Sequence, residues 1–325
     1  MSPLSEHPLP RIAVIVPCHN EAASIAKVVH DFARVLPEAE IHVCDNASTD
    51  DTIAIAEAAG ATIHREQLSG KGNVVRRMFA DVEAEIYVLV DGDDTYDADS
   101  APALIRRLEQ DNLDMVVGTR LAQNDAAYRP GHRLGNLVLT GLVRVVFGNR
   151  ISDMLSGYRV FSRRFVKSFP ALAAGFETET ELTVHALELR MPIAEVGTPY
   201  RERPPDSASK LNTFRDGWRI LRTIVALVRQ ERPIAFFGGV SCLLAAASLV
   251  LAWPVFVTFM QTGLVPRLPT AVLSMGLMLL AFLSLACGLI LDTVTRGRQE
   301  MKRLTYLSAR KRLERRLHGH DLAND

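Results

Sequence analysis

Short apolar runs alternate with helix-like patterns over the first third of the chain. The apolar runs, typical of strands that are covered on both faces, are residues 12–16, 41–44, 86–90 and 114–118. The segments with helical periodicity between them are residues 22–36, 50–59, 72–83 and 100–111. This alternation predicts βαβ units and an α/β, Rossmann-like fold with a mostly parallel sheet.

The pattern becomes less regular after residue 118. We predict a helix over 133–147, a strand near 157–161, a helix over 179–190 and a strand over 193–197. These elements belong to the same domain, which we place at residues 1–207.

Composition changes after Pro204-Pro205, and residues 208–232 have a basic amphipathic pattern. Apolar residues recur there at intervals of three and four, with arginines between them. The apolar positions are Leu211, Phe214, Trp218, Leu221, Ile224, Val225 and Val228, and the arginines are Arg215, Arg219, Arg222 and Arg229. A core helix could have this pattern, but the segment that follows favours a helix on a membrane surface.

Two long stretches without charge come next, from Pro233 to Pro266 and from Leu268 to Leu291. Each exceeds the roughly 20 residues that cross a bilayer as a helix, and the connection between them is too short to be a domain. The sequence therefore predicts a transmembrane hairpin over residues 233–295.

Charge predicts how this hairpin is oriented. Lys+Arg and Asp+Glu number 37 each, so net charge indicates no partner. The connection between the two helices carries only Arg267, whereas the opposite ends carry several basic residues. These are Arg232, Arg296, Arg298, Lys302 and Arg303. The positive-inside rule then predicts that the first domain and the tail lie in the cytoplasm, and we expect a bacterial inner membrane.

The tail, residues 296–325, begins with a basic block. It is a solvated anchor, or it binds anionic lipid headgroups or a neighbouring subunit. Nucleic-acid binding is disfavoured, because the block follows a membrane span and Tyr306 is its only aromatic residue.

Four cysteines, Cys18, Cys44, Cys242 and Cys287, have no paired spacing. Neither a zinc site nor a disulfide framework is indicated. The N-terminus shows no signal peptide, so we expect a reducing compartment for the first domain.

Asp91 and Asp93 come directly after the strand over 86–90, with one glycine between them. Open α/β sheets bind ligands at the carboxyl ends of their strands. Two carboxylates this close repel each other unless a cation lies between them. A hard divalent metal, Mg²⁺ or Mn²⁺, that also holds a diphosphate suits that place. The alternative is a solvated acidic turn.

Polar motifs also follow the first two strands. Residues 16–21 read Val-Pro-Cys-His-Asn-Glu, and residues 44–51 read Cys-Asp-Asn-Ala-Ser-Thr-Asp-Asp. These two motifs, together with Asp91 and Asp93, place polar residues at the ends of three strands on one edge of the predicted sheet. Helix capping is the alternative role for Asn20 and Ser48.

Together these ordered motifs resemble the family 2 glycosyltransferases of the GT-A fold, over residues 11 to about 215. With the membrane hairpin, the whole chain resembles the polyprenyl-phosphate glycosyltransferases, relatives of dolichol-phosphate mannose synthase. The two-helix anchor is most similar to their bacterial glucosyltransferase branch.

The resemblance implies a donor side and a metal site. It implies that Glu21 contacts the ribose, that Asp45 contacts the base, and that Asp91 contacts the sugar or ribose. Asp91 and Asp93 are the implied metal residues, with Asp93 on the diphosphate and Asp94 as a helper. The implied nucleotide-binding residues are Pro17, Asn20, Glu21, Asp45, Lys71, Gly72 and Asp91.

The resemblance also implies an acceptor side. Arg120 and Arg133 would hold the lipid phosphate, for which the forked donors of arginine are well shaped. Ser156 lies in a Ser-Gly-Tyr-Arg turn that matches the acceptor pocket, and Arg159 in that turn is either functional or a partner for a carboxylate.

Two further matches lie later in the chain. Residues 176–179, Phe-Glu-Thr-Glu, match a Phe-x-x-Glu motif, although Thr178 and Glu181 also form a capping-box pattern. Arg203 and Lys210 match a loop that closes over the donor diphosphate.

The predicted function is metal-dependent, inverting transfer of a hexose from a nucleotide sugar, first of all a UDP-sugar, to a polyprenyl phosphate. Asp91, Asp93, Arg120 and Arg133 are the predicted catalytic residues. No base is required, because the phosphate oxygen is already ionised, so positioning and electrostatics carry the reaction.

Three alternatives remain. GDP-mannose could be the donor. Processive polysaccharide synthesis is disfavoured, since there is no Gln-x-x-Arg-Trp motif and there are too few membrane helices. A non-catalytic membrane adaptor would not need the aspartates and arginines above. Small residues such as Gly238 and Gly239 in the first membrane helix favour a homo-oligomer.

Overall fold

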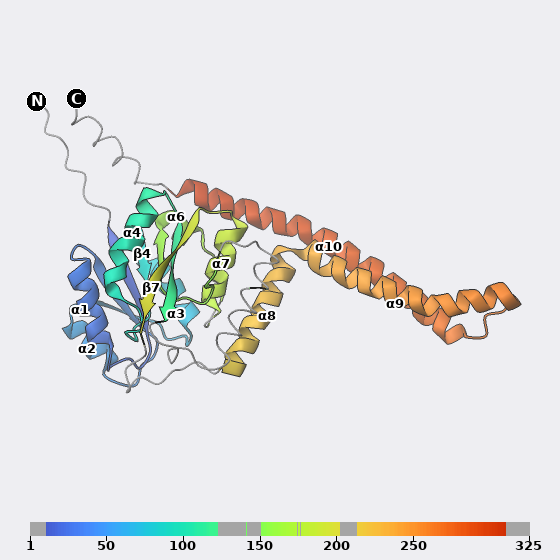
Figure 1. Cartoon of the computed structure of the whole chain (residues 1–325), viewed down its shortest axis with the longest axis horizontal. Coiled ribbons are helices and arrows are strands. Elements are labelled where there is room, and N and C mark those ends of the chain that lie inside the picture. Colours follow the sequence, from blue (N-terminus) through green and yellow to red (C-terminus); the bar gives the residue numbers. More distant parts are fainter. Residues whose placement is uncertain are drawn as a thin grey trace, which may run out of the picture. The chain divides into compact units, whose positions relative to one another are not determined.

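The structure is a computed structural model that describes residues 11–122, 141, 151–173, 175, 177–201 and 213–309. The chain divides into two compact units. The first, called here the catalytic unit, contains the residues up to Leu221 together with those from Lys302 onward, and the second is Arg222–Met301. Figure 1 shows the chain with its elements labelled.

A seven-stranded sheet forms the centre of the catalytic unit, in the order β3-β2-β1-β4-β6-β5-β7. β6 is antiparallel to both neighbours, and the other pairings are parallel. The strands are β1 (Ile12–Cys18), β2 (Glu40–Asp45), β3 (Thr62–Arg65), β4 (Ile86–Leu89), β5 (Met115–Ala122), β6 (Arg159–Ser162) and β7 (Ile193–Tyr200). The predicted α/β fold with a mostly parallel sheet is confirmed.

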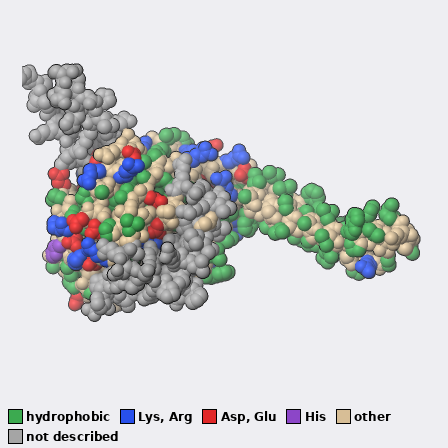
Figure 2. Space-filling view, viewed as in Figure 1, with side chains coloured by type: hydrophobic (Ala, Val, Ile, Leu, Met, Phe, Trp, Pro, Cys, Tyr) green, Lys and Arg blue, Asp and Glu red, His purple; other side chains and the backbone are tan. Residues whose placement is uncertain are grey.

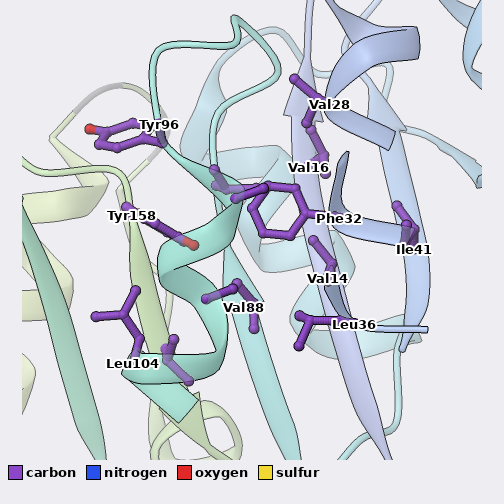
Figure 3. Packing of buried hydrophobic residues seen from close by; sticks show 14 of the residues in the cluster. Val14, Val16, Val28, Phe32, Leu36, Ile41, Val88, Tyr96, Leu104 and Tyr158 are labelled. Atoms are coloured by element: carbon purple, nitrogen blue, oxygen red, sulfur yellow. The ribbon is translucent and has the colours of Figure 1, made fainter. Parts of the chain in front are cut away.

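Helices cover both faces of this sheet. The helices of the unit are α1 (Ile25–Val35), α2 (Thr52–Ala58), α3 (Lys71–Asp81), α4 (Ala101–Gln110), α6 (Arg163–Ser168) and α7 (Thr178–Glu188), with a 3₁₀ turn at Ala98–Ser100. On one face, Val14 and Val16 of β1 pack with Phe32 of α1 and Leu104 of α4 (Figure 3). The alternate residues of β1 point to the other face, where Ile15 belongs to the cluster that α3, α6 and α7 cover.

The apolar runs and periodic segments predicted most of these elements. Two were missed: the edge strand β3, which has the polar sequence Thr-Ile-His-Arg, and the short helix α6. The helix predicted over 133–147 lies outside the described residues, apart from Gly141.

The catalytic unit includes residues from the far end of the chain. The hydroxyl of Tyr306 donates to Asp114 Oδ2 over 2.7 Å, and Lys302 Nζ lies 2.7 Å from Glu188 Oε2 at the end of α7. Asp114 is fully buried and also accepts a hydrogen bond from Ser162 Oγ over 2.6 Å. Because Asp114 immediately precedes β5, these contacts lie at the edge of the sheet opposite the carboxyl end of that strand.

The second unit consists mainly of two long helices. α8 (Thr213–Glu231) leads into α9 (Pro233–Thr262), and α10 (Leu268–Ser308) follows after a short turn. Both α9 and α10 are long and apolar enough to cross a membrane. In the most apolar 18 residues of each helix, only 6% and 17% are buried, whereas the core helix of a soluble protein is mostly buried. Hydrophobic side chains cover them in Figure 2.

Hydroxyl groups join α9 to α10. Ser248 Oγ donates to the carbonyl of Ser274 over 2.6 Å, and Ser284 Oγ donates to the carbonyl of Phe237 over 2.9 Å. The start of the predicted tail, residue 296, is still helical, because α10 continues to Ser308.

Candidate active site

Parallel pairing brings the predicted polar strand ends to one edge of the sheet. Cys18 lies opposite Asp45 in the register of β1 and β2, and the amide of Val90 donates to the carbonyl of Ile15 over 3.1 Å. Asp91, which follows Val90, therefore lies at the same edge as Asp45. Pro17, in β1, pairs with Cys44 one step back from this edge.

Asp93 is buried and its orientation is fixed by the residue two positions on. Its Oδ1 accepts hydrogen bonds from the amide of Thr95 over 3.2 Å and from Thr95 Oγ1 over 2.6 Å. The neighbouring Asp94 has a positive φ of 56° and forms an ion pair with Lys27 of α1 at 2.7 Å. The two carboxylates thus face different partners.

Asp91 forms an ion pair with a buried lysine. Lys71 Nζ contacts Asp91 Oδ1, and it also lies 2.5 Å from Oε1 of Glu179 in the first turn of α7. Burial opposes the charge of Lys71, but the two carboxylates outweigh burial and raise the pKa of Lys71 above its ordinary value. The next residue, Gly72, is buried in α3.

Two glycines are required where the backbone passes close to this motif. A Cβ on Gly92 would lie 2.6 Å from Cys18 Sγ, and a Cβ on Gly157 would lie 2.6 Å from Asp91 Oδ2. The amide of Gly157 donates to the hydroxyl of Tyr96 over 2.8 Å. The aspartates are therefore enclosed by backbone that tolerates no side chain.

The loops after β1 and β2 hold each other. The amide of Asn20 donates to Ser48 Oγ over 2.9 Å, and Asn20 Oδ1 accepts from the amide of Thr49 over 2.7 Å. The capping alternative for Asn20 and Ser48 is wrong, since Ser24 and Asp51 precede α1 and α2.

Next to these loops, the amide of Glu21 donates to Thr52 Oγ1 over 2.8 Å, and Glu21 itself is buried. Two loops of different elements are thereby fixed around one edge.

Asp45 is a buried acid with only one of its two carboxylate oxygens hydrogen-bonded among the described residues. Its Oδ2 accepts from the amide of Ser48 over 3.1 Å, whereas its buried Oδ1 has no hydrogen-bond partner within the described part of the chain. A buried acceptor without a partner is costly, and a ligand N–H at this position would satisfy it.

Sequence reasoning assigned no role to Asn46, whose side chain organises the segment before α3. Its Nδ2 donates to the carbonyls of Glu66 and Leu68 over 3.0 and 2.8 Å, and its Oδ1 accepts from the amide of Gly70 over 2.7 Å. Its position within the motif after β2 was the available signal.

On the other half of the edge, Arg120 of β5 has an internal partner. Its Nε and Nη2 donate to the two oxygens of Asp153 over 2.8 and 2.7 Å, and its guanidinium lies 5.7 Å from the ring centre of Tyr200. Asp153 was not predicted, and because it is 33 residues from Arg120 no local pattern could reveal the pair.

The turn at Ser156 is built from buried polar contacts. Ser156 Oγ donates to the carbonyl of Gly118 over 2.6 Å. Arg159 is fully buried, and its guanidinium donates hydrogen bonds to the carbonyls of Met154 and Ser156 and to the hydroxyl of Thr183. Of the two roles considered for Arg159, the structure shows a structural one, with carbonyl and hydroxyl groups in place of a carboxylate.

The acidic cluster that begins α7 does not form a capping box. Glu181 accepts hydrogen bonds from the amides of Leu172 and Ala173, both over 2.8 Å, instead of reaching back to the helix start. The capping alternative for this cluster is therefore wrong. The predicted site residues Arg133, Arg203 and Lys210, and Phe176 of the Phe-x-x-Glu motif, lie outside the described residues.

The chain is similar to known proteins in both sequence and structure. Residues 13–169 match the domain described as glycosyl transferase family 2. The chain is 32% identical over 303 residues to glycosyltransferase AglJ of Haloferax volcanii, a match that covers 91% of this chain and 98% of AglJ. The protein therefore belongs to glycosyltransferase family 2.

Two further proteins are similar over most of the catalytic unit. Dolichyl-phosphate hexose transferase of Haloferax volcanii is 28% identical over 229 residues, covering 70% of this chain and 99% of that protein. Glucosyl-3-phosphoglycerate synthase from Mycobacterium tuberculosis, solved with Mn²⁺, UDP and glucosyl-3-phosphoglycerate, superposes with a TM-score of 0.55 at 25% identity, over 68% of this chain and 79% of that chain. This protein is accordingly a glycosyltransferase with a GT-A-like fold.

Proposed function

We propose that this protein transfers a hexose from a UDP-sugar to a polyprenyl phosphate, with inversion, at the cytoplasmic face of a bacterial inner membrane. The observation that carries the proposal is the buried carboxylate of Asp93, at the end of β4, in a family 2 chain that continues into two apolar helices of membrane-spanning length. The similarity to a dolichyl-phosphate hexose transferase supports a lipid-phosphate acceptor.

The residues present fit a Mg²⁺ or Mn²⁺ ion that is bound together with the donor. Within the described ranges, no group of three or more His, Cys, Asp or Glu side chains could hold a metal. Mg²⁺ is often held by one or two carboxylates and by substrate phosphates, so Asp93, with Asp91 beside it, is a sufficient protein contribution. When bound, the ion would neutralise charge on the leaving nucleoside diphosphate.

The donor half of the site would be formed by the β1, β2 and β4 ends. Asp45 Oδ1 would accept an N–H of the base, Glu21 would bind the ribose, and Asp91 would accept hydrogen bonds from sugar or ribose hydroxyls. Arg203 and Lys210 would close over the diphosphate. Each of these roles uses oxygen acceptors for hydroxyl or N–H groups and cations for phosphate.

The acceptor half would hold the lipid phosphate with Arg120, Arg133 and Ser156. The nucleophilic oxygen is already ionised near neutral pH, so these residues need only orient it and reduce its repulsion from the donor. The bidentate pair with Asp153 fixes the plane of the Arg120 guanidinium before the acceptor binds.

GDP-mannose is the second candidate donor. The unpartnered oxygen of Asp45 can accept an N–H from either uracil or guanine, so the base is left to experiment. For the membrane half, the excess of basic residues on one side of the hairpin favours a cytoplasmic catalytic domain and tail. Small residues in α9 favour self-association of the hairpin.

The test is a transfer assay with the full chain in detergent. Short polyprenyl phosphate, a panel of UDP- and GDP-sugars, and Mg²⁺ or Mn²⁺ would be supplied, and lipid product would be identified by mass. One glycosylated lipid that disappears with EDTA and with Asp93→Ala is the expected result. Nucleotide binding without any lipid product would contradict the polyprenyl-phosphate acceptor.

A further inference from the structure

A single buried ammonium joins three elements at the candidate site. Lys71 is the first residue of α3, Asp91 follows β4, and Glu179 lies in the first turn of α7. The Lys71 and Glu179 side chains are only 9% and 6% exposed, and the ammonium contacts a carboxylate oxygen of both acids. This cation therefore faces protein carboxylates at close range.

Asp91 is restrained on both of its oxygens. Oδ1 contacts Lys71, and the backbone of Gly157 comes so close to Oδ2 that a Cβ there would lie 2.6 Å from it and 3.1 Å from Lys71 Nζ. A buried charge is retained in proteins when it is paired and hydrogen-bonded. The ammonium of Lys71 and the backbone of Gly157 therefore limit the orientations open to the Asp91 carboxylate.

We propose that Lys71 and Glu179 are a positioning pair for Asp91. Glu179 holds the ammonium, the ammonium holds Asp91, and Asp91 is thereby presented to the hydroxyl groups of the donor. The proposal rests on the proposed function in one respect, that Asp91 contacts the donor. It assigns Glu179 no direct contact with substrate.

Another lysine on the same motif provides a matched control. Lys27 pairs with Asp94 at 2.7 Å, but its side chain is 51% exposed and it bridges to Asp31 on its own helix. Exposed pairs of this kind contribute little. Lys27→Met is therefore expected to change transfer less than about 2-fold.

The test is a double-mutant cycle in the full-length protein, using Lys71→Met, Glu179→Gln and the double variant. Lys71→Met is expected to lower kcat/KM for the donor about 100-fold, the usual cost of a small misplacement at an active site. Glu179→Gln, which keeps the side-chain shape, is expected to cost about 10-fold, and to add nothing further once Lys71 is methionine. Because Lys71 keeps its contact with Asp91, Glu179→Gln should stay folded at the assay temperature, which its thermal midpoint checks.

Multiplicative losses, or a larger loss for Glu179→Gln than for Lys71→Met, would show that Glu179 acts on substrate directly and would overturn the proposal. Donor binding, measured by calorimetry with UDP-glucose and GDP-mannose, separates this proposal from the proposed function. Wild-type protein that binds a nucleotide sugar but makes no lipid product refutes the acceptor only. In that case the double-mutant cycle is repeated with the Kd for the nucleotide sugar as its readout, and this decides whether Lys71 and Glu179 position Asp91. Wild-type protein that binds neither donor refutes both the proposed function and the positioning pair.

Discussion

The two halves of the sheet edge differ in how their charged side chains are paired. On the half formed by β1, β2 and β4, the buried carboxylate of Asp45 has one oxygen without a hydrogen-bond partner among the described residues. On the half that contains β5 and β7, the guanidinium of Arg120 donates to both oxygens of Asp153. A donor that reaches the first half displaces no protein hydrogen bond at Asp45. An anion that reaches the second half shares Arg120 with an internal carboxylate.

This difference suggests what each half has to recognise. An uncharged base needs an open acceptor, and an open carboxylate oxygen is available. A phosphate needs a cation, but an unpaired buried cation would be costly in the empty enzyme, and the pairing with Asp153 removes that cost. The following predictions test the comparison.

The largest effect is expected on the donor half. Asp93→Asn should lower transfer at least about 1,000-fold, since the carboxylate that we propose as the metal ligand is lost where charge develops in the transition state. Initial rates of lipid product formation at saturating metal measure this. Asp94→Asn is the control, because Asp94 faces Lys27, and equal losses in both variants would contradict the assignment.

On the acceptor half, Arg120→Gln should lower kcat/KM for the lipid about 100-fold. Asp153→Asn should cost about 10-fold, as is usual for a residue that orients a ligand-binding group. Both variants should leave the KM for the donor unchanged in steady-state assays with varied donor and lipid. A raised KM for the donor in either variant would contradict the proposed division of the site into a donor half and an acceptor half.

Gly92→Ala tests how tightly the donor half is packed. The new methyl group would meet Cys18 Sγ, so the free energy of unfolding should fall by about 2 kcal/mol and transfer should fall with it. Cys18→Ala in the same chain removes the clash and should restore much of both. Denaturant titration and product formation check the pair, and the absence of restoration would place the cause elsewhere.

Asp45→Asn should weaken donor binding about 10-fold, the value of one hydrogen bond to a charged group, with kcat nearly unchanged. Calorimetry with the free nucleotide diphosphate is the measurement. Asp51→Asn, an exposed residue of the same loop, is the matched control. Equal affinity of the wild type and Asp45→Asn for the nucleotide would contradict the proposal that Asp45 accepts a hydrogen bond from the base.

The last prediction concerns stability alone, at α7, which supplies Glu179. Burial, followed by the charge of Lys302, lowers the pKa of His185 to about 3. Between about pH 6.5 and 3 the unfolded chain therefore binds more protons at His185 than the folded chain does. The contribution of neutral His185 to the free energy of unfolding is present above pH 6.5 and is lost as the pH falls, by at most about 1.4 kcal/mol per pH unit. His185→Gln should flatten the pH dependence of unfolding in that window, and an unchanged slope would contradict it.

Much of the fold followed from apolar runs, because strands buried on both faces leave a continuous signal in the sequence. β3 gave no such signal, since it is a half-exposed edge strand that pairs only with β2. The placement of Asp45 and Asp91 at one edge of the sheet could be predicted, because each lies at or just after the carboxyl end of a strand, and the roles assigned to them and to Asp93 stay predictions. The partners of Arg120 and Lys71 were not, because Asp153 and Glu179 come from distant parts of the chain.

The contact between Tyr306 and Asp114 has a consequence for biosynthesis. The catalytic unit is discontinuous in the chain, with the two apolar helices encoded between its main part and its last described turns. A ribosome must translate both apolar helices before Tyr306 emerges to cover the buried acid. Assembly of this enzyme is thereby ordered in time, with both apolar helices synthesised before its globular domain is complete.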